Sequence, residues 1–316
     1  MAANTATATA TPTVSAAATP TKTRPSPRMR WAPYWQSAPM VAVFAVFFVL
    51  PLLATLIVSF WNYTEYSIEP DFKLQNYVDV FDKCLSGLPT LCTTFKTYVS
   101  TLKFCLIVWL STLLIGFTVS YYIAFEIRKP TTRLILALVC TIPFWTSNVI
   151  RMISWIPLLG RNGLVNQMLI GLGIVKEPQD WLLYSDFSVI LAFVHLNTVF
   201  MIVPIVNSMS RIDRALIEAA YDNGATGWQT LWNVIIPLSK TGIAIGSIFV
   251  ITVVMGDFIT IGLMGGQQIA SIGKVINVEI GYLQFPIAAA NAIILLAVVM
   301  MIIAAMVRFI DIRKEL

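Results

Sequence analysis

Charged residues, histidine and cysteine are scarce in this chain of 316 residues. Only 12% of the residues are Asp, Glu, Lys or Arg, where about 25% is usual in soluble globular domains. The single histidine and the four cysteines, none in a CxxC pair, are too few for a typical metal centre. This composition excludes an ordinary soluble enzyme, a disordered chain and a small secreted domain held together by disulfides.

Sequence signatures of nucleotide binding and catalysis are absent as well. The chain has no GxxxxGK[ST] phosphate loop, no GxGxxG turn and no GxSxG nucleophile elbow. We therefore expect no enzymatic activity and no cofactor or metal in this chain. The net charge is +5, but the basic residues lie beside apolar stretches and form no continuous basic surface, so we expect no nucleic-acid partner.

Long apolar stretches dominate the sequence. Hydrophobic residues make up 57% of the chain, and the mean hydropathy is +0.78. Six continuous stretches approach the length of about 20 residues that a helix needs to cross a bilayer, which predicts an all-α polytopic membrane protein with six transmembrane helices. The stretches are Met40–Phe60, Phe104–Phe125, Leu134–Ile150, Val189–Val206, Thr241–Leu263 and Pro286–Val307. Pro51, Pro143 and Pro204 lie inside three of them, where we expect kinks.

The N-terminal segment differs from the rest in composition. Residues 1–30 are mostly Ala, Thr, Pro and Ser, with four basic residues and no acid. We expect a disordered tail over residues 1–36 and a transmembrane domain over residues 37–316. The basic residues either act as a topology signal or contact anionic lipids. With the tail inside the cell, thirteen of the 21 Lys and Arg residues fall in cytoplasmic segments, which predicts that both termini are cytoplasmic.

The polar segment Asn207–Lys240, between the fourth and fifth predicted spans, carries clear local signals. Ser210 and Asp213 have the spacing of a capping box, which predicts a helix over about Arg214–Asp222. Gly224 follows this helix, where a left-handed backbone is common.

A second helix is predicted after the glycine. Thr226 and Gln229 repeat the capping-box spacing, and Pro237 is expected to stop the helix before the membrane. The segment is therefore predicted to form a helix, a turn and a helix at the cytoplasmic face.

The same segment contains a known pattern. Glu218-Ala219-Ala220 is followed after three residues by Gly224, and after nine more by Val234-Ile235-Ile236-Pro237. This spacing resembles the EAA loop of ATP-binding-cassette (ABC) importer permeases, with Val234 and Ile236 in place of the usual Ile and Leu. The resemblance implies that Glu218, Ala219 and Ala220 contact an ATPase subunit, and that ATP and Mg are bound by that partner.

Other strings are similar to permeases of the spermidine/putrescine importer type, over roughly Ala38–Leu316. They are Pro143-Phe144-Trp145-Thr146-Ser147, Leu158-Leu159-Gly160-Arg161-Asn162-Gly163, Gly256-Asp257-Phe258 and Gly265-Gly266, with Arg151 and Trp155 between the first two. The resemblance implies the ABC importer permease fold in a bacterial inner membrane. It also implies a second permease subunit, an ATPase dimer, a periplasmic solute-binding protein and a polyamine or related cation as the solute.

Three ionisable residues in the predicted spans are candidates for the solute path or outer gate. Asp257 is sixteen residues into the fifth span, about 24 Å from its inner edge, at a depth similar to Arg151 and His195. Asp257 either attracts a cationic solute or forms a structural ion pair with Arg151. His195 either lines the path or is a core histidine bonded to a neighbouring helix. Trp145 and Trp155 either contact an amine through their rings or anchor the membrane interface.

Cys84 and Cys92 fall in a predicted outer segment, Trp61–Lys103, where they are either bridged or free.

An alternative function is a secondary transporter driven by an ion gradient, which usually has inverted repeats and several buried acids. A membrane-bound enzyme would need clustered His or Asp ligands. Neither alternative explains the EAA pattern.

Overall fold

The computed structural model describes residues 27–63, 68–81 and 93–309. Cys84, Cys92 and residues 1–26 of the expected tail lie outside the described residues. Residues 27–36, which we expected to be disordered, belong to the first helix, α1 (Pro27–Phe44). The chain forms two compact units, residues 1–53 and residues 54–316.

The described part of the first unit, from residue 27 on, is a single run of helix. α1 continues through a π-helical turn, η1 (Ala45–Val49), into α2 (Leu50–Val58), which extends into the second unit. Pro51 is the second residue of α2 and comes directly after the π turn. A wider π turn removes the clash between a proline ring and a preceding carbonyl, so the helix passes this proline without a break.

The second unit contains a two-stranded ribbon and all the remaining helices. The ribbon pairs β1 (Asn62–Tyr63) with β2 (Ile68–Glu69) in antiparallel register, with Asn62 opposite Glu69. The helices are α3 (Gln75–Val80), α4 (Thr93–Tyr121), η2 (Tyr122–Glu126), α5 (Pro130–Thr141), η3 (Ile142–Trp145), α6 (Asn148–Ile153), α7 (Ile156–Leu159), α8 (Leu164–Gly171), η4 (Asp180–Leu182), α9 (Asp186–Met209), α10 (Arg214–Asp222), α11 (Gly227–Thr230), η5 (Leu231–Ile235), α12 (Ile236–Gly256), α13 (Ile259–Met264), α14 (Ile272–Gly281) and α15 (Phe285–Phe309).

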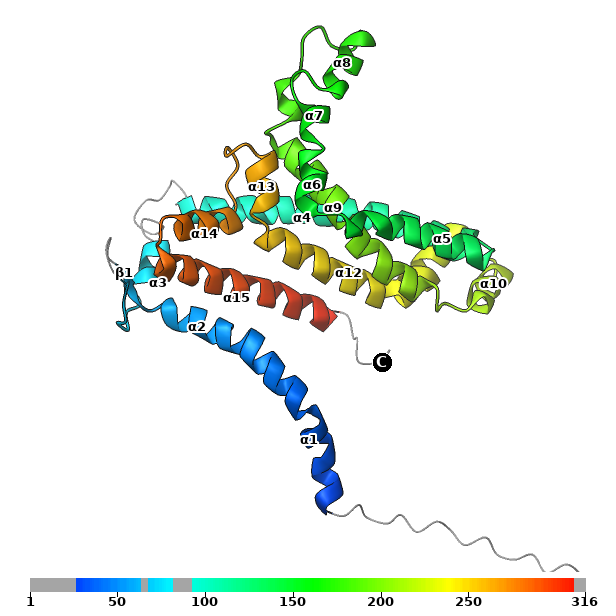
Figure 1. Ribbon diagram of the computed structural model, residues 1–316. Coiled ribbons are helices and arrows are strands. Elements are labelled where there is room, and N and C mark those ends of the chain that lie inside the picture. Colours follow the sequence, from blue (N-terminus) through cyan, green and yellow to red (C-terminus); the bar gives the residue numbers. More distant parts are fainter. Residues whose placement is uncertain (1–26, 64–67, 82–92, 310–316) are drawn as a thin grey trace, which may run out of the picture. The chain divides into compact units, whose positions relative to one another are not determined.

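Three long helices, α4, α9 and α12, lie side by side and form the centre of this unit (Figure 1). Glycines allow the helices to approach closely. A Cβ atom at Gly242 would lie 2.5 Å from the Pro204 carbonyl oxygen, and one at Gly246 would lie 2.8 Å from the Met201 sulfur. Gly116 of α4 faces the same methionine, at 2.7 Å from its Cγ. Gly242 and Gly246 have the GxxxG spacing that favours close packing of transmembrane helices.

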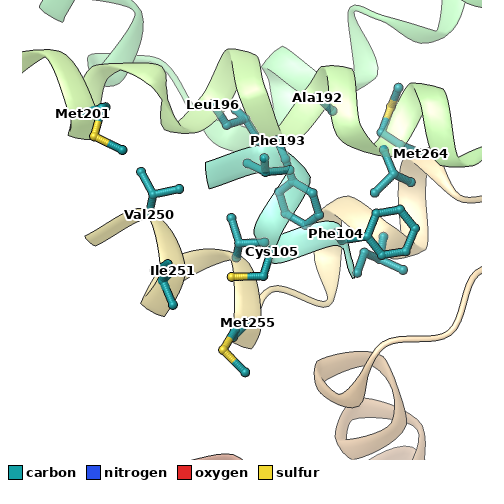
Figure 2. Close-up of a cluster of buried hydrophobic side chains, with 14 of the residues drawn as sticks. Phe104, Cys105, Ala192, Phe193, Leu196, Met201, Val250, Ile251, Met255 and Met264 are labelled. Carbon is teal, nitrogen blue, oxygen red and sulfur yellow. The ribbon is translucent and has the colours of Figure 1, made fainter. Parts of the chain in front are cut away.

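The buried core lies between these helices. Its buried side chains include Phe104 and Cys105 of α4, Phe193 and Met201 of α9, and Met255 of α12, which Figure 2 labels. Large sulfur-containing and aromatic side chains fill the space left by the glycines, because methionine adapts its shape to irregular gaps.

The number of spans agrees with the prediction, with two corrections. Five helical segments are long and apolar enough to cross a membrane, and a sixth span results if a bent pair of helices is counted as one. The predicted span Leu134–Ile150 covers the break of that bent pair, whose two parts, Pro130–Trp145 and Asn148–Gly171, meet at 91°. The pair continues 21 residues beyond the predicted end, to Gly171. Pro143 lies in the 3₁₀ turn before the bend, and Thr146 is extended, so the helix cannot continue straight.

The predicted span Thr241–Leu263 is the second correction. The helix ends at Gly256, and Asp257 has an extended backbone, with φ −77° and ψ 124°. A separate short helix, α13, follows. Pro204, where a kink was predicted, lies inside α9. The helix continues on both sides of this proline without interruption.

Candidate functional site

The first helix of the predicted coupling segment has the expected bounds. α10 spans Arg214–Asp222, and Asp213 is its N-cap residue. The Asp213 carboxylate accepts a hydrogen bond from the Ala215 N–H at 3.0 Å. The predicted pairing of Ser210 with Asp213 is wrong, because Ser210 keeps helical backbone angles at the end of α9. Asp213 therefore caps the helix alone.

The turn after α10 depends on glycine. Gly224 has φ +81°, in the left-handed region that other residues rarely adopt. Its N–H donates to the Tyr221 carbonyl at 2.8 Å, and the Ala225 N–H donates to the Ala220 carbonyl at 3.0 Å. These bonds satisfy carbonyl groups that the end of α10 leaves free, so the predicted role of this glycine is confirmed.

The second helix starts with the predicted capping box. The Thr226 N–H donates to the Gln229 side-chain oxygen at 2.8 Å, and the Gln229 N–H donates to the Thr226 hydroxyl at 3.3 Å. The predicted stop at Pro237 is wrong. α11, the π turn η5 and α12 form one continuous helical span from Gly227 to Gly256, and Pro237 follows the π turn as Pro51 does in the first unit.

The surface of this segment is unusually open. α10 has no buried residue, and Glu218 and Ala219 are both exposed. Leu216 and Tyr221 are also exposed, as is Trp228 on α11. In the described part of the chain Glu218 forms no ion pair. An exposed helix with an unpaired acid, two alanines and apolar side chains can accept the surface of another protein.

The residues predicted for an outer gate lie on several elements: Asp257 follows the last residue of α12, Arg151 is on α6, and His195 is inside α9. The Asp257 carboxylate accepts hydrogen bonds from the Thr260 N–H and hydroxyl, both at 2.8 Å. Arg151 is 8% exposed and donates to the Asn148 side-chain oxygen. The predicted ion pair between Asp257 and Arg151 is not present among the described residues, because Asp257 instead holds the first turn of α13.

His195 and Trp145, two of the predicted gate residues, have different surroundings. His195 is exposed and accepts a hydrogen bond from the Trp155 ring N–H at 3.1 Å, with the rings edge to face at 5.6 Å. It is bonded to a neighbouring segment as one alternative predicted, but it is not a core residue. Trp145 is 83% exposed, with its ring beside Phe144. Among the described residues, neither Trp145 nor Asp257 forms a hydrogen bond or a ring contact with His195 or Trp155.

One polar cluster was missed from the sequence. The buried Asn291 on α15 donates to both carboxylate oxygens of Glu279 on α14, at 2.8 and 3.0 Å. Partial burial raises the pKa of Glu279, and the hydrogen bond from Asn291 opposes that rise. The signal was visible as an asparagine inside the apolar stretch 286–307 and a lone acid shortly before it.

Comparisons with known proteins give one consistent result. Residues 29–315 match the family model of binding-protein-dependent transport system inner membrane components. The spermidine/putrescine transport system permease protein PotB of Escherichia coli (strain K12) is 31% identical over 258 residues, which cover 81% of this chain and 90% of PotB. PotB of Haemophilus influenzae is 33% identical over 242 residues, covering 74% of this chain and 78% of that protein.

The solved structures support the same fold. A chain of a bacterial alginate ABC transporter, crystallised with an alginate-bound periplasmic protein, superimposes with a TM-score of 0.67 at 18% identity. The match covers 88% of this chain and 93% of the other. The family match spans nearly the whole described chain, from the N-terminal helix to α15. This chain therefore belongs to the binding-protein-dependent transport system inner membrane component family, the multi-pass permeases of ABC importers.

Proposed function

We propose that this chain is the permease subunit that forms half of the translocation path of an ATP-driven polyamine importer. The observation that carries the proposal is the exposed helix α10, which a glycine turn joins to one of the longest spans. The relatives named for spermidine and putrescine transport support a polyamine or related organic cation as the solute. A second permease subunit, an ATPase dimer and a periplasmic binding protein complete the proposed complex.

The continuous helix from Gly227 to Gly256 supports a mechanical role for α10. Thirty residues of helix extend about 45 Å at 1.5 Å per residue, enough to cross the membrane. Because Gly242 and Gly246 hold α12 directly against α9, the two helices move together. A partner that shifts α10 would therefore move both spans and displace Asp257 at their far end.

The proposed cycle is alternating access, with both termini and α10 in the cytoplasm. ATP binding closes the ATPase dimer, α10 follows its docking cleft, and the spans open outward to receive the solute from the binding protein. Hydrolysis returns the inward-facing state. ATP and Mg belong to the partner ATPase, and this chain positions the spans without catalysing a reaction.

The test is reconstitution of this chain in liposomes with its partner permease, ATPase and binding protein. ATPase activity should rise when the binding protein and either spermidine or putrescine are added. Glu218→Lys reverses the charge on α10 and should reduce this stimulation roughly tenfold or more, as expected for loss of an interfacial charge contact. Glu177→Lys makes the same change at another exposed acid and should have little effect.

Two outcomes would contradict the proposal in different ways. If the ATPase fails to copurify with the wild-type chain, α10 is not a docking helix. If the complex assembles but no polyamine stimulates it, the importer assignment stands and the polyamine assignment is wrong.

A further inference from the structure

A polar cavity lies beside the coupling segment, where three spans end. Its volume is about 580 Å³. The residues around it come from the end of η2, the first turns of α5 and the link between α9 and α10. Three arginines, Arg133, Arg211 and Arg214, line it together with Asp213. We call these three residues the arginine pocket.

The charge of the arginine pocket is not neutralised within the chain. Arg133 donates to the Ala124 carbonyl at 2.5 Å, and Arg214 donates to the Phe125 carbonyl at 3.5 Å. Both partners are neutral groups at the end of η2. Among the described residues no carboxylate forms an ion pair with any of the three arginines. Asp213, the one acid in the lining, accepts the Ala215 N–H at the start of α10.

Capping of η2 explains only part of this arrangement. Cationic side chains are favourable near the carbonyl end of a helix, which accounts for one contact each from Arg133 and Arg214. It leaves the Nε of Arg133 buried without a hydrogen-bond partner, and it gives no role to Arg211. A buried guanidinium donor without a partner is costly, so the pocket is incomplete as it stands.

The chemistry of the pocket fits a phosphate group. Guanidinium groups bind phosphate oxygens through paired N–H donors, and several can share one phosphate. The location favours a phosphate that belongs to a lipid, because helix ends lie at the headgroup level of the membrane. Leu134, directly after Arg133, is 61% exposed, and Ile135 and Leu138 are similarly exposed along α5. These apolar side chains provide a surface for acyl chains below the headgroup.

We propose that the arginine pocket binds the phosphate headgroup of an anionic phospholipid, with its acyl chains along α5. Basic pockets between transmembrane helices are known to select such headgroups. The bound phosphate would join η2 and α5 to the first turn of α10. The lipid would then fix the coupling helix relative to two spans.

The test measures lipid binding by the purified full chain in detergent, using native mass spectrometry. Phosphatidylglycerol should bind in preference to phosphatidylcholine. Arg211→Gln, Arg133→Gln and Arg214→Gln should each weaken phosphatidylglycerol binding about fivefold, as expected for one basic residue at an anionic membrane surface. Arg308→Gln, at an exposed arginine in the last turn of α15, is the matched control and should leave binding unchanged.

Arg211→Gln is the decisive variant, because the Arg211 side chain has no hydrogen bond to any described residue that its loss would break. Equal binding of both lipids, or unchanged binding by all three variants, would overturn the proposal. Competition by inorganic phosphate at the same concentration as the lipid would show a site for the free ion. If Arg211→Gln abolishes copurification of the ATPase but keeps lipid selectivity, the pocket binds the partner protein instead. The lipid-binding measurements need neither transport activity nor the ATPase, so their outcome is independent of the proposed function.

Discussion

The two ends of the α9 and α12 pair are built in different ways (Figure 1). At one end, α10 has no buried residue, and no described carboxylate forms an ion pair with the arginine pocket. At the other end, short helices bury polar and apolar side chains, among them Arg151 on α6 and Thr260 on α13. Asp257 finds both of its hydrogen bonds within its own segment. Asp257 is therefore satisfied within its own segment, although Nε and Nη1 of Arg151 at the same end are buried without a partner among the described residues. The surface of α10 and the arginine pocket are exposed instead, and we propose that other molecules cover them.

Gly242 lies where α12 packs closely against α9. Its replacement should have the largest effect on stability. In Gly242→Leu the new side chain would meet the Pro204 carbonyl and the Ser208 side chain. A clash with backbone cannot be relieved by a rotamer change, so we expect a loss of about 3 kcal/mol or more in stability. The measurement is the yield and thermal unfolding of the purified chain.

A control for this variant exists on the same helix. A Cβ atom at Gly256 would meet nothing within 4 Å, so Gly256→Ala should leave the melting temperature almost unchanged. Equal melting temperatures for Gly242→Leu and the wild type would show that α9 and α12 do not need this close approach.

Gly224→Val should damage the coupling end alone. Valine at φ +81° costs about 1–2 kcal/mol, because its Cβ atom meets the neighbouring carbonyl. We expect α10 to lose its fixed orientation, so that polyamine-stimulated ATPase activity falls while the chain still folds. Gly171→Ala, at a glycine without a left-handed backbone and with open space around it, should keep full activity.

Substitutions of Asp257 test whether the opposite end is closed by its own hydrogen bonds. Asp257→Ala removes the acceptor for Thr260 and should cost about 1 kcal/mol, the usual value for a helix cap. Asp257→Asn keeps an oxygen for the Thr260 N–H and should be more stable than the alanine variant. Spermidine uptake separates the two roles: normal uptake by Asp257→Asn would indicate a structural cap, and a loss of uptake with normal stability would indicate that the charge acts on the solute.

The smallest effect is expected at Glu279. Its pKa is raised by burial, so the folded protein binds a proton more readily than the unfolded chain. Stability should therefore fall as the pH rises from the ordinary value of 4.5 through the raised pKa of the folded state. Glu279→Gln keeps an acceptor for Asn291 and should remove this pH dependence. The free energy of unfolding should change by less than about 1 kcal/mol. Thermal unfolding of both proteins between pH 4 and pH 7 measures this pH dependence. If the melting temperature of Glu279→Gln varied with pH as that of the wild type does, Glu279 would not be its cause.

The coupling segment was predictable because its geometry depends on neighbours in the sequence. The bounds of α10, the left-handed Gly224 and the pairing of Thr226 with Gln229 all result from contacts within a few residues. The error at Ser210 has the same origin. The spacing was present, but the preceding helix continued to Met209, so Ser210 ends that helix with helical backbone angles.

The opposite end could not be predicted in this way. Hydropathy measures how apolar a segment is and not its direction, so the stretch from Leu134 to Ile150 gave no sign of the 91° bend. The expected pairing of Arg151 with Asp257 assumed two straight helices, and both are broken near these residues. The contact between Glu279 and Asn291 joins two separate helices, which periodicity within one helix does not reveal.

The π turn η5 has a consequence for the evolution of chain length in this segment. Its five residues, Leu231–Ile235, separate the coupling helices from the part of α12 that packs against α9. Each residue of an α-helix adds about 100° of rotation, and a π turn holds one residue more than an α turn. Deletion of one residue here would convert the π turn to an α turn, and because each closes about one turn, the coupling helices would keep nearly the same rotation around the axis of α12. Deletion of one residue from the α-helical part of α12 would instead rotate them by about 100°. The π turn η5 therefore tolerates the loss of one residue, whereas in the α-helical segment that follows it the number of residues fixes the side to which Glu218 points.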